Sequence, residues 1–386
     1  MEDVKSIAVA FFGSFFNVWF VGLIVLFYSL LYSLQDALIY HPRNYRGRYA
    51  NYYSRAHEMA VEKLKNVNGG VVKEIYYTTP GDSVKHTAYW IPPFARSYFK
   101  ICNDPYVEYL KQNPRKGDVN NFDLWITANG NAGLALDWLT FTSKYAESLH
   151  KERTIAPDRN PPSSFLLLDY PGYGENVGGT PSPSTIQTAF KFALLALQKE
   201  MRRYYGKAHV RTCNEEIYGK ESKNRFGLNY NFKALAHSIG SSAVLQFGAS
   251  TLGDTKLHVE KYVLISPFSS MYEMTKLVVG PLPFIKYILK HDWDNLRYIQ
   301  KIGTCANCTA TERMRYDAKR VKISIIHGKM DEVVPFKMGE GLFEYAKEIK
   351  DKANGDLQLR FTAIKRANHN NIVTVAQDDI MKQMMS

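Results

Sequence analysis

A chain of 386 residues with 45% hydrophobic and 22% charged residues can bury a large core, so disorder and low complexity are excluded. The formal net charge of +12 and the pI of about 9.2 raise the question of a nucleic-acid partner. The lysines and arginines are scattered, however, and no zinc finger, basic zipper or base-stacking motif accompanies them. We therefore expect no nucleic-acid partner, and a basic surface that faces water or anionic lipid instead.

The N-terminus carries an apolar segment that predicts a membrane anchor. No charged residue occurs from Ser6 to Leu34, and a helix of about 20 apolar residues is enough to cross a bilayer. A cleaved signal peptide is the alternative. Its apolar region is shorter, about 7 to 15 residues, and follows positive charge, whereas Glu2 and Asp3 begin this chain. We expect residues 1–36 to be retained as a transmembrane helix in contact with membrane lipids.

Basic residues on the two sides of this segment predict its orientation. Arg43, Arg46 and Arg48 follow it, whereas only Lys5 precedes it. The positive-inside rule therefore places the main body of the chain on the cytoplasmic side, or on the equivalent side of an organelle membrane. Residues 37–70 are predicted to form a polar juxtamembrane linker, and residues 71–386 a single folded domain.

The folded domain begins with a predicted antiparallel hairpin. Its strands are residues 71–77 and 84–91, and Pro80-Gly81-Asp82 forms the turn between them. A third strand, residues 124–127, runs into a glycine-containing loop from Asn129 to Gly133. This loop leads into a predicted helix.

Buried strands and amphipathic helices alternate through the rest of the domain. Phe165 to Asp169 is continuously apolar, as expected of a strand buried on both faces. From about residue 183, apolar residues recur at the i, i+3, i+4 spacing of one helical face. Further strands are predicted at residues 232–236, 262–266, 323–327 and 357–364. This alternation predicts an α/β fold, with a mostly parallel sheet covered by helices on both faces.

Two segments are too long for plain connections between these elements. Residues 206–230 are polar and basic, and we interpret them as a surface insertion. Residues 267–320 contain short apolar runs, and we expect them to form a cap over the site, because long segments in compact domains are commonly functional.

One serine lies where a predicted strand becomes a helix. Ala236-His237-Ser238-Ile239-Gly240 matches the small-x-Ser-x-Gly pattern of a nucleophile elbow, in which small flanking residues permit a sharp turn that exposes the hydroxyl. In the α/β-hydrolase fold the acid and the base follow the serine along the chain. Asp331 follows the strand of residues 323–327, and His369 follows the strand of residues 357–364. All three are therefore predicted at the same edge of the sheet.

These residue types suit acyl transfer. A serine hydroxyl is a weak nucleophile until a base accepts its proton, and an imidazole is the usual side chain for that role at neutral pH, which points to His369 as the base. Asp331 would orient that imidazole and stabilise its charged form. The backbone N–H groups of Ile239 and Asn131 are predicted to donate to the oxyanion.

Other histidines and cysteines are interpreted more simply. His237 and His327 are expected to be structural neighbours of their turns. Cys305 and Cys308 form a C-x-x-C pair, but no second pair of ligands accompanies them at a spacing that suits zinc, so we expect no metal site.

Several motifs, taken in order, give the chain a resemblance to the membrane-anchored branch of the α/β-hydrolase-domain family, which includes protein depalmitoylases and lipid esterases. The motifs that carry the resemblance are Ile39-Tyr40-His41-Pro42, Tyr77-Thr78-Thr79-Pro80, Ile91-Pro92-Pro93, Asn129-Gly130-Asn131-Ala132-Gly133, Asp169-Tyr170-Pro171-Gly172-Tyr173-Gly174, His237-Ser238-Ile239-Gly240, Ile265-Ser266-Pro267-Phe268, Ile326-His327-Gly328 with Asp331, and His369-Asn370. The resemblance implies hydrolysis of esters or thioesters, often of acyl chains near a membrane, without a metal or organic cofactor. The chain departs from the family at Asn129-Gly130, where His-Gly is usual, and in the length of the insertion at 206–230.

Two functions are compatible with this pattern. The first is a membrane-anchored serine hydrolase that cleaves acyl esters or thioesters of lipids or acylated proteins. The second is a catalytically weak or inactive hydrolase-fold scaffold, or an accessory subunit of a membrane complex. The presence of all three residue types favours the enzyme.

Overall fold

A computed structural model describes residues 2–95, 121–155, 160–205, 209–212, 227–252, 254, 257–283, 285–304, 321–353 and 357–386. The helices are α1 (Glu2–Ile39), η1 (Gly47–Tyr49), α2 (Ala50–Asn68), η3 (Ala135–Trp138), α4 (Leu139–Ile155), α5 (Pro183–Tyr204), α7 (Ile239–Ser250), α8 (Met271–Val279), η4 (Ile285–Ile288), α9 (Asn295–Thr304), α11 (Phe336–Ala353), α12 (Ile372–Val375) and α13 (Gln377–Met385). The strands are β1 (Lys73–Tyr77), β2 (His86–Ile91), β3 (Asn121–Ala128), β4 (Ser163–Leu168), β5 (His209–Thr212), β6 (Gly227–His237), β7 (Lys261–Ile265), β8 (Lys322–Gly328) and β9 (Gln358–Ile364).

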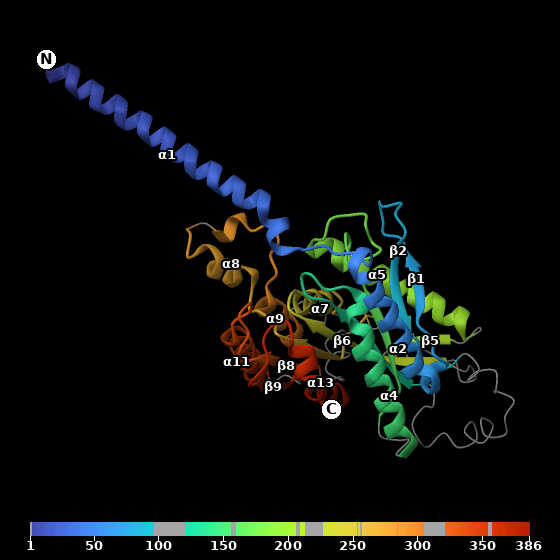
Figure 1. Cartoon of the computed structure of the whole chain (residues 1–386). Coiled ribbons are helices and arrows are strands. Elements are labelled where there is room, and N and C mark those ends of the chain that lie inside the picture. The colour runs from blue at the N-terminus through green and yellow to red at the C-terminus, as the bar shows by residue number, and fades with distance from the viewer. Residues whose placement is uncertain are drawn as a thin grey trace.

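The strands form one mixed sheet in the order β1-β2-β4-β3-β6-β7-β8-β9, with β5 paired to the start of β6 (Figure 1). The opening hairpin β1–β2 is antiparallel, and β2 also runs antiparallel to β4. All later pairs are parallel. The predicted α/β fold is therefore confirmed. A mostly parallel sheet with a serine turn at the end of a central strand is the arrangement of the α/β-hydrolase fold.

Helices cover both faces of the sheet because successive strand residues point to opposite sides. Leu166 and Leu168 of β4 pack into one core, and Phe165 and Leu167 into the other. The first core includes buried residues of α5, α7, α9 and α11. The second includes buried residues of α2, α4, α12 and α13. The continuously apolar run in β4 follows from burial on both faces.

The segment that we interpreted as a polar linker contains helix α2. Its buried residues Ala56, Ala60 and Leu64 recur every four residues and so form one helical face. Asn68, its last residue, bonds through its side-chain nitrogen to the carbonyls of Val71 and Pro92. This helix packs on the folded domain. Its buried face has only five residues, two of them alanines, and gave only a weak signal in the sequence.

The expected cap at 267–320 includes two different kinds of structure. Helix α8 and the short helix η4 lie next to the C-terminal end of α1 (Figure 1). Helix α9, in contrast, buries Ile299 and Ile302 in the first core with α7 and α11. We therefore use the term cap only for residues 267–294. The rest of the expected cap, residues 305–320, lies outside the described residues, as do all four cysteines and most of the predicted insertion at 206–230.

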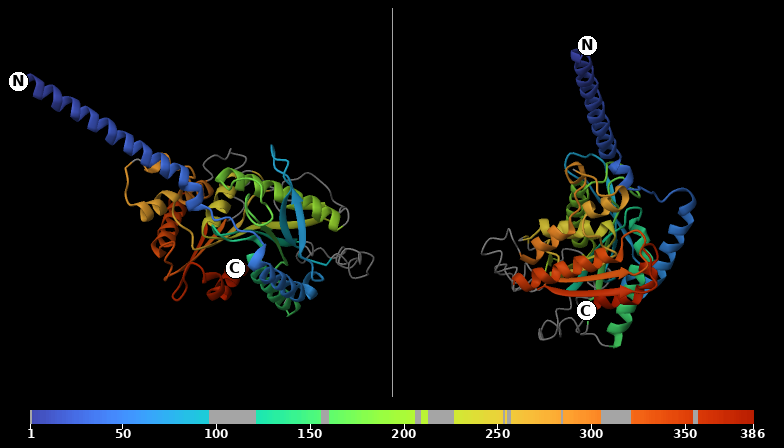
Figure 2. Two further views of the ribbon diagram at one scale, coloured as in Figure 1. Left: turned by 45° about the horizontal axis from the view of Figure 1, so that its top comes forward. Right: turned by 90° about the vertical axis from the view of Figure 1, so that its left-hand side faces the viewer.

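Helix α1 extends away from the domain in all three ribbon views (Figures 1 and 2). Within it, Trp19–Ile39 is a segment of 21 residues that is long and apolar enough to cross a membrane. Almost none of this segment is buried by the rest of the chain. By length and composition, then, the predicted N-terminal span corresponds to a continuous helix.

Candidate active site

Ser238 occupies a strained turn between β6 and α7. Its φ is 55°, a left-handed value that is rare for residues other than glycine, and it immediately precedes the helix that begins at Ile239. Its N–H donates to the carbonyl of Ile265 at 2.8 Å, which fixes the turn to the neighbouring strand β7. A strained residue between a strand and a helix is the geometry of a nucleophile elbow.

Gly240, two residues after the serine, is required by a close approach of two backbone segments. A Cβ added at Gly240 would lie 2.4 Å from the carbonyl oxygen of Ala128 at the end of β3. The pattern that identified this turn in the sequence therefore has a steric basis, since only glycine permits this contact.

Hydrogen bonds connect the three predicted residues. Nε2 of His369 lies 3.0 Å from Oγ of Ser238, and its Nδ1 lies 2.9 Å from Oδ2 of Asp331. Because a carboxylate only accepts, Nδ1 carries the proton and Nε2 is free to accept from the serine hydroxyl. All three residues are buried. Residues separated by 131 and 38 positions in the chain thus meet at the carboxyl edge of the sheet.

The surroundings of Asp331 keep its carboxyl group ionised. Burial raises its pKa, but the hydrogen bond from His369 and the electrostatic attraction between the two groups lower it, and the net pKa lies below the usual range. The backbone N–H groups of Val333 and Val334 also donate to Oδ1 at 3.1 and 2.8 Å. An anionic Asp331 is the form that can hold His369 in the tautomer described above.

Two further histidines hydrogen-bond to the segments that carry His369 and Asp331. Nε2 of His237 donates to the carbonyl of His369 at 3.0 Å, and burial lowers the pKa of His237 to about 3, so its ring is neutral. Nε2 of His327 donates to the carbonyl of Val334 at 2.9 Å, beside Asp331. The sequence suggested only that both were structural neighbours. The bond of His237 joins residues 132 positions apart and so leaves no local signal in the sequence, whereas the bond of His327 spans seven positions.

A second loop faces Ser238 from the end of β3. Asn131 and Ile239 line the same cavity as Ser238. No acceptor within the described residues bonds to the backbone N–H of Asn131, and Ile239 provides one of the unpaired N–H groups at the start of α7. Both donors are therefore available to a bound anion or carbonyl oxygen.

Asn129 joins the start of this loop to the segment at the end of β4. Its side-chain nitrogen donates to the carbonyl of Leu168 at 3.1 Å, and its main-chain carbonyl accepts from the hydroxyl of Tyr170 at 2.8 Å. Asn129 is buried and lies two residues before Asn131. The chain has Asn129-Gly130 where the family that it resembles usually has His-Gly. This difference does not remove the backbone N–H of Asn131.

The chain directly after α1 holds the same loop, which the sequence did not reveal. The N–H of His41 and the hydroxyl of Tyr173 donate to the carbonyl of Asn131, at 3.1 and 2.5 Å. Nη1 of Arg43 donates to the carbonyl of Ala132 at 3.1 Å. The motif at residues 39–42, which contributed to the family resemblance, thus lies against the candidate site.

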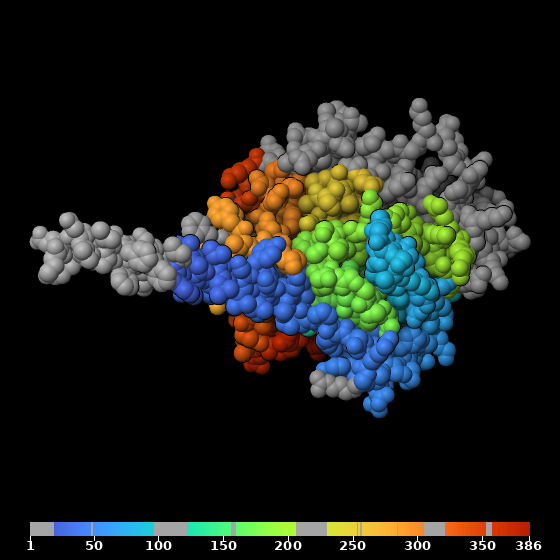
Figure 3. All heavy atoms as spheres, turned by 90° about the horizontal axis from the view of Figure 1, so that it is seen from above, coloured from blue at the N-terminus to red at the C-terminus, as the bar shows by residue number. Residues whose placement is uncertain are grey.

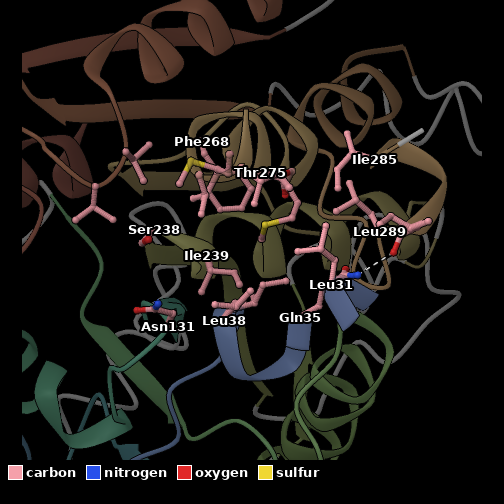
Figure 4. Close-up of a pocket in the computed structure, with 18 residues that line it drawn as sticks. Leu31, Gln35, Leu38, Asn131, Ser238, Ile239, Phe268, Thr275, Ile285 and Leu289 are labelled. Atoms are coloured by element: carbon pink, nitrogen blue, oxygen red, sulfur yellow. Dashed lines mark hydrogen bonds between the residues drawn. The ribbon is translucent and has the colours of Figure 1, made fainter. Parts of the chain in front are cut away.

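An apolar cavity of about 180 Å³ opens beside Ser238 (Figure 4). Its walls come from five parts of the chain: the last turns of α1, the loop that carries Asn131, the turn that carries Ser238, the cap, and the turn after β8. The cap residues that line it are Phe268, Met271, Met274, Thr275, Val278, Val279, Ile285, Ile288 and Leu289. Most of these side chains are apolar, so the cavity suits a hydrocarbon group.

Within the described residues, no group of three or more His, Cys, Asp or Glu side chains has an arrangement that could hold a metal ion. The C-x-x-C pair at Cys305 and Cys308 lies outside those residues.

No family model matches this sequence, and no curated protein matches it. Among solved structures, the chain is similar to an esterase from Pyrococcus furiosus, with 12% identity, a TM-score of 0.45 and coverage of 90% of this chain and 95% of that chain. It is also similar to Est1E from Butyrivibrio proteoclasticus, with 14% identity, a TM-score of 0.41 and coverage of 81% and 97%. An acylaminoacyl peptidase from Pyrococcus horikoshii shows 10% identity and a TM-score of 0.43; the match covers 81% of this chain and only 39% of the peptidase. The fold assignment rests on the strand order and the serine turn described above.

Proposed function

We propose that this chain is a serine hydrolase that cleaves acyl esters or thioesters of lipids or acylated proteins. The observation that carries the proposal is the continuous hydrogen-bonded series from Ser238 through His369 to Asp331. Ser238 is a strained residue, and it lies beside two available backbone donors and an apolar cavity. Nucleophile, base, orienting carboxylate, oxyanion donors and acyl pocket are the parts that acyl transfer needs.

The proposed reaction has two stages. Oγ of Ser238 attacks the carbonyl carbon while its proton passes to Nε2 of His369, and the N–H groups of Asn131 and Ile239 bind the oxyanion. The intermediate collapses when the bond to the leaving alcohol or thiol breaks and His369 returns the proton to that group. Water then attacks the acyl-serine by the same route and releases the carboxylic acid.

The non-enzymatic scaffold remains the alternative outcome. It was motivated by the unusual Asn129-Gly130 sequence, but Asn129 is bonded to Leu168 and Tyr170, at the end of β4 and in the turn after it. A scaffold also does not require a serine with φ of 55° beneath an open cavity. These features favour the enzyme.

Labelling by a fluorophosphonate probe tests the proposed nucleophile. Wild-type protein should be labelled, because its serine is hydrogen-bonded to Nε2 of His369, and Ser238→Ala should abolish labelling. Ser241→Ala is the matched control, because Ser241 is a buried serine on the adjoining helix α7. No labelling of the wild type would contradict the proposal, and so would equal labelling of Ser238→Ala.

We further propose that α1 anchors the hydrolase domain in a membrane, with the domain on the cytoplasmic or equivalent side. Full-length protein should remain in the pellet after carbonate extraction, whereas a variant without residues 1–36 should move to the supernatant. The physical reason is the apolar helix at Trp19–Ile39. Full-length protein that is released by a simple salt wash would show that this helix does not span a bilayer.

A further inference from the structure

One face of the anchor helix forms part of the cavity beside Ser238. Leu31, Gln35, Leu38 and Ile39 of α1 line that cavity. They fall at positions i, i+4, i+7 and i+8, which lie on one face of a helix. Leu30 adjoins Leu31 in sequence but is 55% exposed and does not line the cavity, whereas Leu31 is half-buried and lines it. Leu38 also lines the cavity but is 57% exposed, so part of its side chain remains outside it. The side of α1 that carries Leu31 is thus distinct from the side that carries Leu30.

Polar contacts fix this part of α1 to the cap. Gln35 donates through Nε2 to the carbonyl of Ile288 at 2.8 Å and accepts through Oε1 from the N–H of Lys290 at 2.7 Å. The carboxylate of Asp36 bonds to both Lys290 and His291. These contacts join residues more than 250 positions apart in the chain. The end of α1 is therefore held in register with the cap.

The cavity extends along α1 away from the serine. Among the residues labelled in Figure 4, Ser238 and Asn131 lie on one side and Leu31, Ile285 and Leu289 on the other, with Ile239 and Leu38 between them. An acyl group attached to Ser238 would therefore pass Leu38 before it reached Leu31. The side chain at position 31 is placed to limit the length of that group.

The cap presents apolar side chains outside the cavity as well. Leu277, Val278 and Tyr287 are 56%, 75% and 84% exposed, and Val278 also lines the cavity. Figure 3 shows the cap, in orange, directly against the described part of α1, in blue. An exposed apolar surface that continues an apolar helix is suited to contact with lipid. The rim of the cavity therefore faces the same apolar phase as α1.

We propose that the segment Leu31–Ile39 of α1 is a wall of the acyl-binding site and sets acyl-chain length for substrates that are resident in the bilayer. This inference rests on the proposed function, because it assigns the cavity to the acyl group that Ser238 receives. The anchor helix then has two roles, as a tether and as a specificity element. Deletion of residues 1–36 removes Leu31 and Gln35 together with the tether.

Substitutions at adjacent positions separate these two roles. Leu31→Trp places an indole at the far end of the cavity, whereas Leu30→Trp places it on the exposed side of the same helix turn. With full-length protein in detergent micelles, we measure kcat/KM for p-nitrophenyl acetate and octanoate. Leu31→Trp should lower the octanoate-to-acetate ratio by about tenfold or more, because each excluded methylene costs roughly a fourfold loss. Leu30→Trp should leave the ratio at its wild-type value.

Binding of lauric acid to the Ser238→Ala background gives a second measurement that does not need catalysis. Adding Leu31→Trp should weaken this binding at least tenfold, and adding Leu30→Trp should not change it. A wild type that is labelled and hydrolyses both esters, but shows the same ratio as Leu31→Trp, would overturn the acyl wall and leave the hydrolase standing. Binding that is sensitive to position 31 in a protein that hydrolyses no ester would support the wall and overturn the hydrolase.

Discussion

Replacement of Asp331 by asparagine is expected to lower esterase kcat by about four orders of magnitude, and His369→Ala should lower it by a similar amount or more. The reason is the hydrogen bond from Nδ1 of His369 to Asp331, at 2.9 Å. An asparagine amide in this place can donate to Nδ1 and favour the tautomer with its proton on Nε2, which cannot accept from Ser238. Steady-state hydrolysis of a p-nitrophenyl ester measures the loss.

Controls separate this loss from unfolding and from a general effect of charge. Glu332→Gln removes the neighbouring carboxylate, which is exposed, and should leave kcat near the wild-type value. The double variant Asp331→Asn/His369→Ala should be no slower than His369→Ala alone, because the members of a triad act as a unit. Circular dichroism should show folded protein in every case. A Glu332→Gln variant as slow as Asp331→Asn, or an active Asp331→Asn, would contradict the assignment of the acid.

The sequence predicted the parts of the fold whose signal is local. The apolar run at Phe165 to Leu168 and the turn at Ser238 were recognisable because burial on both faces and a sharp backbone turn each require particular residue types at successive positions. The order of Ser238, Asp331 and His369 placed them at one edge of a parallel sheet. Their hydrogen bonds in the structure follow from that topology.

Features that depend on contacts between distant segments were not predictable in this way. Helix α2 was interpreted as a linker because its buried face contains only two alanines, a tyrosine, a leucine and an asparagine. Helix α9 was assigned to the cap, although its amphipathic stripe belongs to the core. The inner face of α1 had no signal of its own, because every residue from Ser6 to Leu34 is uncharged and Gln35 finds its partners in Ile288 and Lys290. In each case the decisive partner lies far away in the sequence.

The length of the acyl group should control the rate of the wild-type enzyme. For p-nitrophenyl esters from acetate to laurate, kcat/KM should rise by roughly fourfold for each added methylene, since burying one CH₂ contributes about 0.8 kcal/mol. The rise should end when the cavity is full. A cavity of about 150 Å³ accommodates benzene, so the cavity of about 180 Å³ beside Ser238 should hold a chain of roughly six carbons. Longer chains would then extend past α1 and the cap toward the bilayer.

The shape of this profile distinguishes a lipid-facing site from other possibilities. A rise to about hexanoate followed by a plateau is the outcome expected of a cavity lined by apolar side chains of α1 and the cap. Met274→Ala offers a matched test, since Met274 lines the cavity from α8 and its truncation should shift the plateau to a longer chain. Thr188→Ala, on an exposed part of α5, should leave the profile unchanged. A profile that falls steadily from acetate would contradict an acyl-binding cavity and would indicate either a site for small esters or a hydrolase fold without this catalytic role.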